Sequence, residues 1–281
     1  MRFRSVMLMA LVATACSSNQ ESASTAPAAA ATIVPGATQA QARLTASPRH
    51  GEWVVVKTGA NDSVRAYLVY PERKSKAPVV VVIHEIFGLS NWVRSVADQL
   101  AADGFIAIAP DLLTKFNVVQ TATGEPNPDS ARAAIGRIKK EQYQPQIRKV
   151  AEYAMSLPAA TKKYGVVGYC WGGGAVFAHA VWYPDVNAVV SYYGTTPEPA
   201  DYTKVKAPVL GLYGENDARV NATIARADTA SKKYKFKYEP HIFAGAGHGF
   251  LRAQDGANGA NLAAAKEAWP LTVNWFRSNL K

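Results

Sequence analysis

Cys170 lies at the centre of a Gly-x-Cys-x-Gly pattern, within residues 166–174, which read Val-Val-Gly-Tyr-Cys-Trp-Gly-Gly-Gly. Glycines two residues on either side of a nucleophile are typical of a sharp turn from a strand into a helix, where the backbone is crowded. Two glycines at these offsets arise by chance at about 0.5% of positions when glycine usage is about 7%. The pattern predicts an exposed cysteine nucleophile. The alternative, on this motif alone, is a small buried cysteine in a glycine-rich turn.

A base and an acid that could serve this cysteine follow it in the chain. Enzymes that present a nucleophile on such a turn place the acid next and the histidine last. His248 stands in the glycine-rich run 244–249, after the last expected strand, and Asp217 follows an expected strand over 209–213. Asp217 would hold the His248 tautomer, and neighbouring Glu215 is the residue most easily confused with it. The other histidines have less suitable positions in the chain: His50, His84, His179 and His241.

Glu85 directly follows an apolar run over residues 79–84. A carboxylate beside a developing oxyanion is unfavourable unless it has a chemical task, and a cysteine thiol supplies one. A free thiol has a pKa near 8.5 and is only a few per cent thiolate at neutral pH. We therefore expect Glu85 to take the proton of the thiol when substrate binds; the alternative is an exposed loop charge.

Strands and helices alternate along the sequence in a way that brings these residues together. β-Branched and apolar runs predict strands, and helical spacing between them predicts helices covering a parallel sheet on both faces. Chemistry in such sheets gathers at the carboxyl ends of the strands. Expected strands are 52–56, 64–70, 79–84, 105–109, 166–168, 188–193, 209–213 and 237–243, and expected helices are 91–104, 129–157, 172–183, 222–233 and 262–280.

Residues 1–16 have the pattern of a bacterial signal peptide. Arg2 and Arg4 precede a short apolar run over 6–12, and the run is too short for a bilayer span, which needs about 20 residues. Residues 13–16, Ala-Thr-Ala-Cys, resemble a lipobox, which predicts lipidation at Cys16; ordinary cleavage after Ala15 is the alternative. The sequence thus predicts a protein exported to the periplasm and anchored to a membrane by lipid alone.

Residues 17–47 consist mainly of Ala, Ser, Thr, Pro and Gln, which predicts a disordered tether. One domain is then expected over 48–281, with Cys170 as its single cysteine. A thiol redox function requires a resolving cysteine, and this domain has none.

The basic charge of the chain is dispersed. Residues 48–281 contain 28 basic and 20 acidic side chains, a formal net charge of +8. The basic side chains form only doublets, without the stripe or interleaved aromatic residues of a nucleic-acid binder. We therefore expect no nucleic-acid partner, although a positive field would help to attract an anionic substrate.

The motifs together resemble those of the dienelactone hydrolase family over most of residues 50–281. The matching segments are residues 81–89, 109–112, 168–173, 192–194 and the surroundings of Asp217 and His248. The resemblance implies an α/β-hydrolase fold, no cofactor or metal, and a Cys170–Asp217–His248 triad with Glu85 as its distinctive carboxylate.

The same resemblance implies further site residues. Backbone amides of Ile86 and Trp171 would form the oxyanion hole, and Arg252, four residues after the histidine, would bind a substrate carboxylate. The remaining residues expected at the substrate are Phe87, Tyr193 and Phe250, with Arg132, Arg137 and Tyr143 as candidates in a region that does not align.

The expected activity is hydrolysis of a lactone or activated ester through a thioester on Cys170. The substrate is then a small molecule, with a preference for an anionic one if Arg252 binds it. Two alternatives remain at this point: a general carboxylesterase or thioesterase, and a tethered binding protein of the same fold without catalysis.

Overall fold

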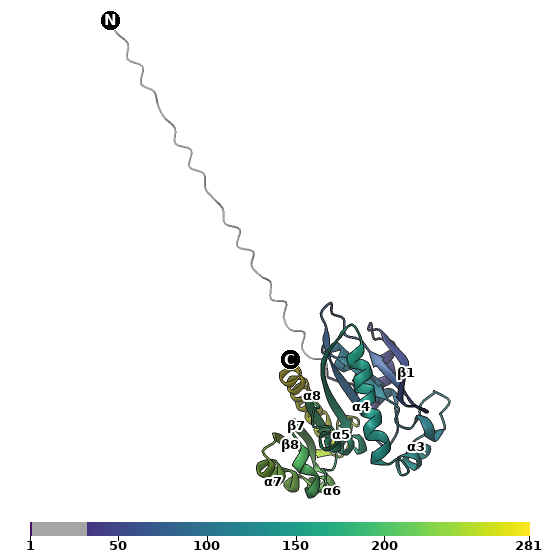
Figure 1. Ribbon diagram of the computed structural model, residues 1–281, viewed down its shortest axis with the longest axis vertical. Coiled ribbons are helices and arrows are strands. Elements are labelled where there is room, and N and C mark those ends of the chain that lie inside the picture. Colours follow the sequence, from purple (N-terminus) through teal and green to yellow (C-terminus); the bar gives the residue numbers. More distant parts are fainter. Residues whose placement is uncertain (2–32) are drawn as a thin grey trace. The chain divides into compact units, whose positions relative to one another are not determined.

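A single sheet of eight strands forms the centre of the protein. The computed structural model describes Met1 and residues 33–281, and within the latter range the strands stand in the order β1-β2-β4-β3-β5-β6-β7-β8. Figure 1 labels β1 near one edge of the sheet and β7 and β8 near the other. β1 and β2 pair antiparallel, as do β2 and β4, and all later neighbours are parallel. The strands are β1 Gly51–Gly59, β2 Asp62–Val69, β3 Ala77–Ile83, β4 Ile106–Pro110, β5 Ala160–Tyr169, β6 Ala188–Tyr192, β7 Val209–Asn216 and β8 Tyr238–Gly247.

Helices cover both faces of this sheet, because its central strands are apolar on both sides. In β3, Val80 and Val82 pack into the core with the helices Asn91–Ala102 and Ala260–Asn279, whereas Val79 and Val81 pack into the core with the helices Lys140–Ser156 and Trp171–Trp182. All four valines are fully buried. The helices are α1 Ala40–Thr45, α2 Asn91–Ala102, α3 Pro128–Ile135, α4 Lys140–Ser156, α5 Trp171–Trp182, α6 Ala218–Asn221, α7 Ile224–Tyr234 and α8 Ala260–Asn279. The predicted α/β architecture, with a mostly parallel sheet, is confirmed.

The prediction of one helix over 129–157 is wrong. Two helices, α3 and α4, occupy this region, and Gly136–Lys139 separates them. The side chain of Asn127 begins α3 by accepting hydrogen bonds from the amides of Asp129 and Ser130 at 3.1 and 3.0 Å. Another difference is that β5 starts six residues earlier than expected, at Ala160, because that end of the strand pairs with Ala77 of β3.

The linker predicted over 17–47 is also wrong for its last part, since residues 33–47 fold onto the domain. Val34 is fully buried, and its carbonyl accepts a hydrogen bond from Gln254 at 2.7 Å. The indole of Trp92 donates to the carbonyl of Pro35 at 3.1 Å. This segment needs few large side chains to become ordered, because the domain residues that it contacts are already held in place. The predicted signal peptide, Cys16 and the first part of the predicted linker lie outside the described residues.

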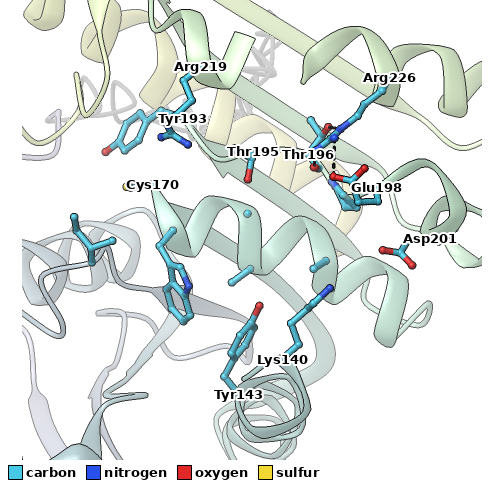
Figure 2. Close-up of a pocket in the computed structure, with 16 residues that line it drawn as sticks. Lys140, Tyr143, Cys170, Tyr193, Thr195, Thr196, Glu198, Asp201, Arg219 and Arg226 are labelled. Atoms are coloured by element: carbon cyan, nitrogen blue, oxygen red, sulfur yellow. Dashed lines mark hydrogen bonds and ion pairs between the residues drawn. The ribbon is translucent and has the colours of Figure 1, made fainter. Parts of the chain in front are cut away.

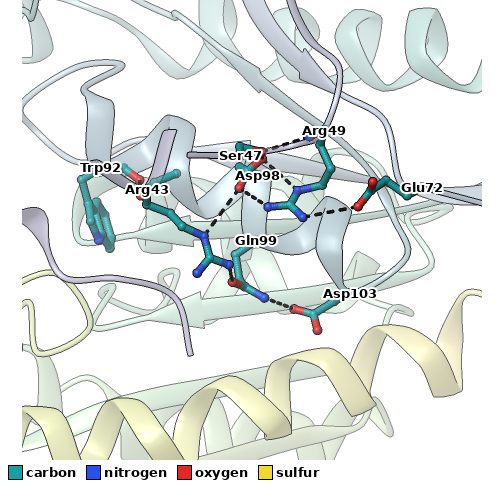
Figure 3. A network of polar contacts seen from close by, with 9 residues as sticks. Arg43, Ser47, Arg49, Glu72, Trp92, Asp98, Gln99 and Asp103 are labelled. Atoms are coloured by element: carbon teal, nitrogen blue, oxygen red, sulfur yellow. Dashed lines mark hydrogen bonds and ion pairs between the residues drawn. The ribbon is translucent and has the colours of Figure 1, made fainter. Parts of the chain in front are cut away.

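A polar network anchors the segment that follows (Figure 3). Asp98 of α2 is 2% exposed, and its two oxygens accept hydrogen bonds from Nε and Nη2 of Arg49 at 2.9 and 2.6 Å. The hydroxyl of Ser47 donates to the same carboxylate, and Nη2 of Arg43 donates to Gln99 at 2.5 Å. The two hydrogen bonds between Arg49 and Asp98 fix the direction in which the chain enters β1. Among the described residues, no helix is both long and apolar enough to cross a membrane.

Candidate active site

Cys170 occupies a strained turn between β5 and α5. Its backbone has φ 55° and ψ −115°, which non-glycine residues rarely adopt. The flanking glycines make this turn possible: a Cβ on Gly168 would lie 2.1 Å from the carbonyl oxygen of Gly172, and one on Gly172 would lie 2.4 Å from that of His84. Side chains at either position would force the strand and helix apart. The turn therefore presents the thiol at the carboxyl edge of the sheet.

His248 connects this thiol to Asp217. Nε2 of His248 lies 3.1 Å from Sγ of Cys170, and Nδ1 lies 2.5 Å from Oδ2 of Asp217. Asp217 follows β7 directly, and its other oxygen accepts from the amide of Val220 at 3.4 Å, which caps α6. His248 follows β8 directly. Two parallel neighbouring strands thus deliver the acid and the base to one edge, and the structure brings the three predicted residues together.

The thiol is held in its neutral form. Burial is the largest cause that raises the pKa of Cys170, to about 11, and the negative charge of Glu85 adds to it. The amide of Trp171 and the positive charge of Arg219 act in the opposite direction. A neutral thiol donates to Nε2 of His248 in this arrangement, and His248 then donates from Nδ1 to Asp217. A base must therefore remove this proton before the sulfur could act as a nucleophile.

Glu85 is a buried carboxyl at the same edge of the sheet. It follows β3, is 4% exposed, and its Oε2 lies 3.3 Å from Nε of Arg252. Burial raises the pKa of Glu85 from 4.5 to about 7, although the guanidinium of Arg252 lowers it. A carboxyl of this pKa is poised to exchange a proton at neutral pH. The exposed-charge alternative for Glu85 is thus wrong.

Two backbone amides occupy the positions expected for an oxyanion hole. Trp171 is the first residue of α5, so its amide has no acceptor within the helix. The amide of Ile86 lies in the turn after β3 and donates no hydrogen bond to the rest of the described chain. Both residues line the same cavity as Cys170. The two N–H groups are therefore available to a negatively charged oxygen.

A cavity of about 460 Å³ opens next to Cys170 (Figure 2). The predicted residue Tyr193 and the candidate Tyr143 line it, and Tyr143 packs edge-on against Trp171 with ring centroids 5.0 Å apart. The other lining residues belong to α5, to residues 195–201 and to the first turns of α4, α6 and α7: Lys140, Gly174, Ala175, Ala178, Thr195, Thr196, Pro197, Glu198, Asp201, Arg219 and Arg226.

Other predicted substrate residues lie away from this cavity. Phe87 packs beneath the guanidinium of Arg252, 4.7 Å from ring centroid to Cζ, outside the cavity lining. Arg132 also stacks on Phe87, at 5.2 Å, whereas Arg137 lies over Phe116. These contacts group Phe87 with Arg252, outside the lining of the cavity beside Cys170.

The prediction that Phe250 contacts substrate is wrong. Its side chain is fully buried and packs against Tyr193 and Phe243, with centroids 5.4 and 5.3 Å apart. Phe250 therefore supports Tyr193 from behind. Conversely, Arg219 and Lys140 line the cavity although neither was among the residues expected at the site. Arg219 stands two residues after Asp217, and that short offset was the available signal for it.

Metal ligands do not gather anywhere in the described residues. Among them, no group of three or more His, Cys, Asp or Glu side chains could hold a metal ion. The site contains the thiol of Cys170, the imidazole of His248, the carboxylate of Asp217 and the amides of Ile86 and Trp171. Together with the eight-strand order and the turn at Cys170, this arrangement defines the class: the protein has the α/β-hydrolase fold.

The chain belongs to the dienelactone hydrolase family, whose model matches residues 64–280. It is 29% identical over 232 residues to a protein of Salmonella typhimurium named "Putative carboxymethylenebutenolidase", covering 76% of this chain and 83% of the relative. A protein of the same name from Saccharolobus solfataricus is 28% identical over 245 residues, covering 76% of this chain and 93% of that one. The chain is accordingly a hydrolase similar to these proteins.

A solved structure shares the fold. The crystal structure of dienelactone hydrolase from Anabaena variabilis superposes with a TM-score of 0.62 at 24% identity, covering 83% of this chain and 99% of that one. The likeness therefore includes essentially the whole of the solved chain.

Proposed function

We propose that the enzyme hydrolyses a lactone or an activated carboxylic ester through a thioester on Cys170. The single observation that carries this proposal is the continuous line of contacts from Sγ of Cys170 through His248 to Asp217, at 3.1 and 2.5 Å. The family's small-molecule ester and lactone chemistry supports it. A substrate with a good leaving group suits a thiolate, because the leaving oxygen must depart as readily as the sulfur.

Attack begins with a proton transfer. Glu85 turns toward Cys170 and takes the thiol proton, and a substrate carboxylate that engages Arg252 favours this turn by competing for the guanidinium. The thiolate then forms a bond to the carbonyl carbon, and the amides of Ile86 and Trp171 hold the resulting oxyanion. One such donor is worth about 2.7–4 kcal/mol in the transition state. Collapse of this intermediate breaks the bond to the leaving oxygen, which departs as an enolate or phenolate.

Water completes the turnover. His248 removes a proton from the water that attacks the thioester, with Asp217 stabilising the imidazolium. The carbon–sulfur bond breaks, the acid product departs, and Cys170 regains the proton from Glu85. The proton on His248 returns to solvent. Each group thereby finishes in its starting state.

The test uses nitrophenyl acetate and the substitution Cys170→Ala. We expect hydrolysis to fall by about 10⁴-fold or more, since removing a nucleophile disables the whole triad. Cys170→Ser is the matched control, because it keeps the size of the side chain while its hydroxyl is a poorer acid for Glu85. Full activity in the alanine variant would exclude the thioester, and circular dichroism would establish that it is folded.

We also propose that the chain is exported and anchored through lipid at Cys16. The support for this is the composition of residues 1–16 alone. Mass spectrometry of the mature protein from bacterial membranes tests it: a diacylglyceryl group on Cys16 is expected, and an unmodified N-terminus there or elsewhere contradicts it. Cys16→Ala should release the domain from the membrane fraction.

A further inference from the structure

The cavity beside Cys170 continues as a groove along one face of α5. Four residues of this helix line it, namely Trp171, Gly174, Ala175 and Ala178. Their spacing places them on one helical face, which Figure 2 shows running from Cys170 toward Asp201. Ala178 lies seven residues after Trp171, and at a rise of 1.5 Å per residue this separation gives the floor a length of about 10 Å. We call these four residues and the walls beside them the α5 groove.

Small side chains keep the α5 groove open. Beyond Trp171, the floor consists of one glycine and two alanines, and Ala178 is half-buried with its methyl group at the cavity surface. A Cβ at Gly174 would lie 3.3 Å from the carbonyl oxygen of Thr195, so Thr195 packs against the floor there and forms one wall of the groove. Larger residues at 174 or 178 would close the passage. The width of the groove is therefore set by α5 itself.

The nature of the walls changes along the groove. Near Cys170 they include aromatic side chains and one cation, with Tyr143 on one side and Tyr193 and Arg219 on the other. At the far end they are charged: Lys140 and Asp201 face the groove, and Glu198 pairs with Arg226 at 2.8 Å. Between these two ends the floor of one glycine and two alanines is apolar, which suits the methylenes of a linear acyl chain.

The position of His248 determines which part of a substrate enters the groove. Cys170 and both oxyanion amides line the cavity, whereas His248 does not. In the proposed reaction, the water activated by His248 takes the place that the leaving oxygen has vacated. The leaving group must therefore lie on the His248 side, and the substituent of the carbonyl carbon must point away from it. That direction leads into the α5 groove.

We propose that the α5 groove is an acyl-chain subsite, that it accepts linear chains of about hexanoyl length, and that Ala178 limits how far a chain extends. This inference rests on the proposed function, because it assigns the two ends of an ester substrate. It is separate from the interaction of Arg252 with a carboxylate, since Arg252 does not line the groove.

A series of nitrophenyl esters tests the subsite. For the whole protein, kcat/KM should increase from acetate through butyrate to hexanoate, by up to roughly fourfold for each methylene that becomes buried. kcat/KM should not increase further for acyl chains longer than the one whose end reaches Lys140 and Asp201. Equal kcat/KM values for acetate and hexanoate would overturn the proposal.

The decisive variant is Ala178→Leu, which places three additional carbons across the floor of the groove. Relative to wild type, the ratio of kcat/KM for hexanoate to kcat/KM for acetate should fall at least tenfold. Ala263→Leu is the matched control, because Ala263 is exposed on α8 and lines no part of the cavity. An equal loss for acetate and hexanoate in Ala178→Leu would overturn the assignment.

Alkylation of Cys170 tests the groove without turnover. Iodoacetamide and N-hexyl iodoacetamide both form a carbon–sulfur bond with the thiolate and release iodide, and peptide mass spectrometry follows Cys170 specifically. Ala178→Leu should slow only the hexyl reagent. If wild-type enzyme hydrolyses no ester, the proposed function fails, and this measurement still decides the subsite. Equal rates of hexyl labelling in wild type and variant would overturn it.

Discussion

Arg252 forms an ion pair with Glu85, in which Nε of the guanidinium lies 3.3 Å from Oε2 of the carboxyl. Glu85 is almost fully buried, whereas the Arg252 side chain is 36% exposed and accessible to a substrate anion. A substrate carboxylate that binds Arg252 competes directly with Glu85 for the guanidinium. In the proposed reaction, the ion pair would thereby couple the binding of an anionic substrate to the release of Glu85 as the base for Cys170.

Glu85→Gln should change the reactivity of Cys170 and the turnover of the enzyme in opposite directions. After burial, the negative charge of Glu85 is the next cause that raises the pKa of Cys170. Removing this charge lowers that pKa, so iodoacetamide should label the resting enzyme faster at mildly alkaline pH. Ester hydrolysis should fall by about a hundredfold, since a general base contributes 10²–10⁴-fold. Slower labelling together with slower hydrolysis would instead indicate damage to the site.

Arg252→Gln should move the acid limb of kcat/KM to higher pH. The carboxyl of Glu85 must be ionised to accept a proton, so activity should decrease as pH falls through about 7. Arg252 lowers the pKa of Glu85, and its removal raises that pKa further. The pH profile for an uncharged nitrophenyl ester measures this shift. An unchanged acid limb would contradict the coupling, and Arg132→Gln serves as the control for a second arginine beside Phe87.

The same carboxyl should make the folded state less stable as pH rises. The pKa of Glu85 is about 7 in the folded protein and 4.5 as the reference value. A raised pKa contributes stability that is complete below about 4.5 and is lost as pH rises through about 7. Across this window the loss is about 3 kcal/mol, at 1.36 kcal/mol per pKa unit. Urea unfolding of wild type and Glu85→Gln should diverge by this amount with rising pH; parallel curves would exclude it.

The positions of the central site residues could be predicted because they depend on chain order and strand ends. Cys170, Asp217 and His248 each follow a strand directly, and parallel strands bring such residues to one edge. The direction of a loop side chain could not be predicted in this way, because it depends on tertiary contacts. Phe250 stands two residues after His248, yet it turns into the core, because Tyr193 and Phe243 provide apolar contacts there.

Tertiary partners also explain the error over residues 33–47. The composition of this segment offers little apolar area, and composition describes only what a segment can bury by itself. Val34 and Pro35 instead use sites that the domain supplies, at Gln254 and Trp92. Arg219 was missed for a similar reason, since it reaches the cavity only because the cap at Asp217 turns α6 at that point. A local sequence pattern does not show which distant residues a segment contacts in the folded protein.

Asp98→Asn should destabilise the attachment of the N-terminal segment to the domain. The carboxylate of Asp98 receives two hydrogen bonds from Arg49, whose side chain is 8% exposed. An amide at this position cannot neutralise the guanidinium, and breaking a buried ion pair costs about 3 kcal/mol. For a domain of this size, that cost lowers Tm by roughly 6–12 °C.

Glu72→Gln provides the matched control for this prediction. Glu72 lies 3.7 Å from the same guanidinium, but its side chain is 61% exposed. Water therefore screens the pair, and its loss should cost less than about 1 kcal/mol. Differential scanning calorimetry of the two variants distinguishes the contributions. The expected result is a large decrease in Tm that is confined to Asp98→Asn. Similar decreases in Tm for both variants would mean that the burial of Asp98 does not set the strength of its interaction with Arg49.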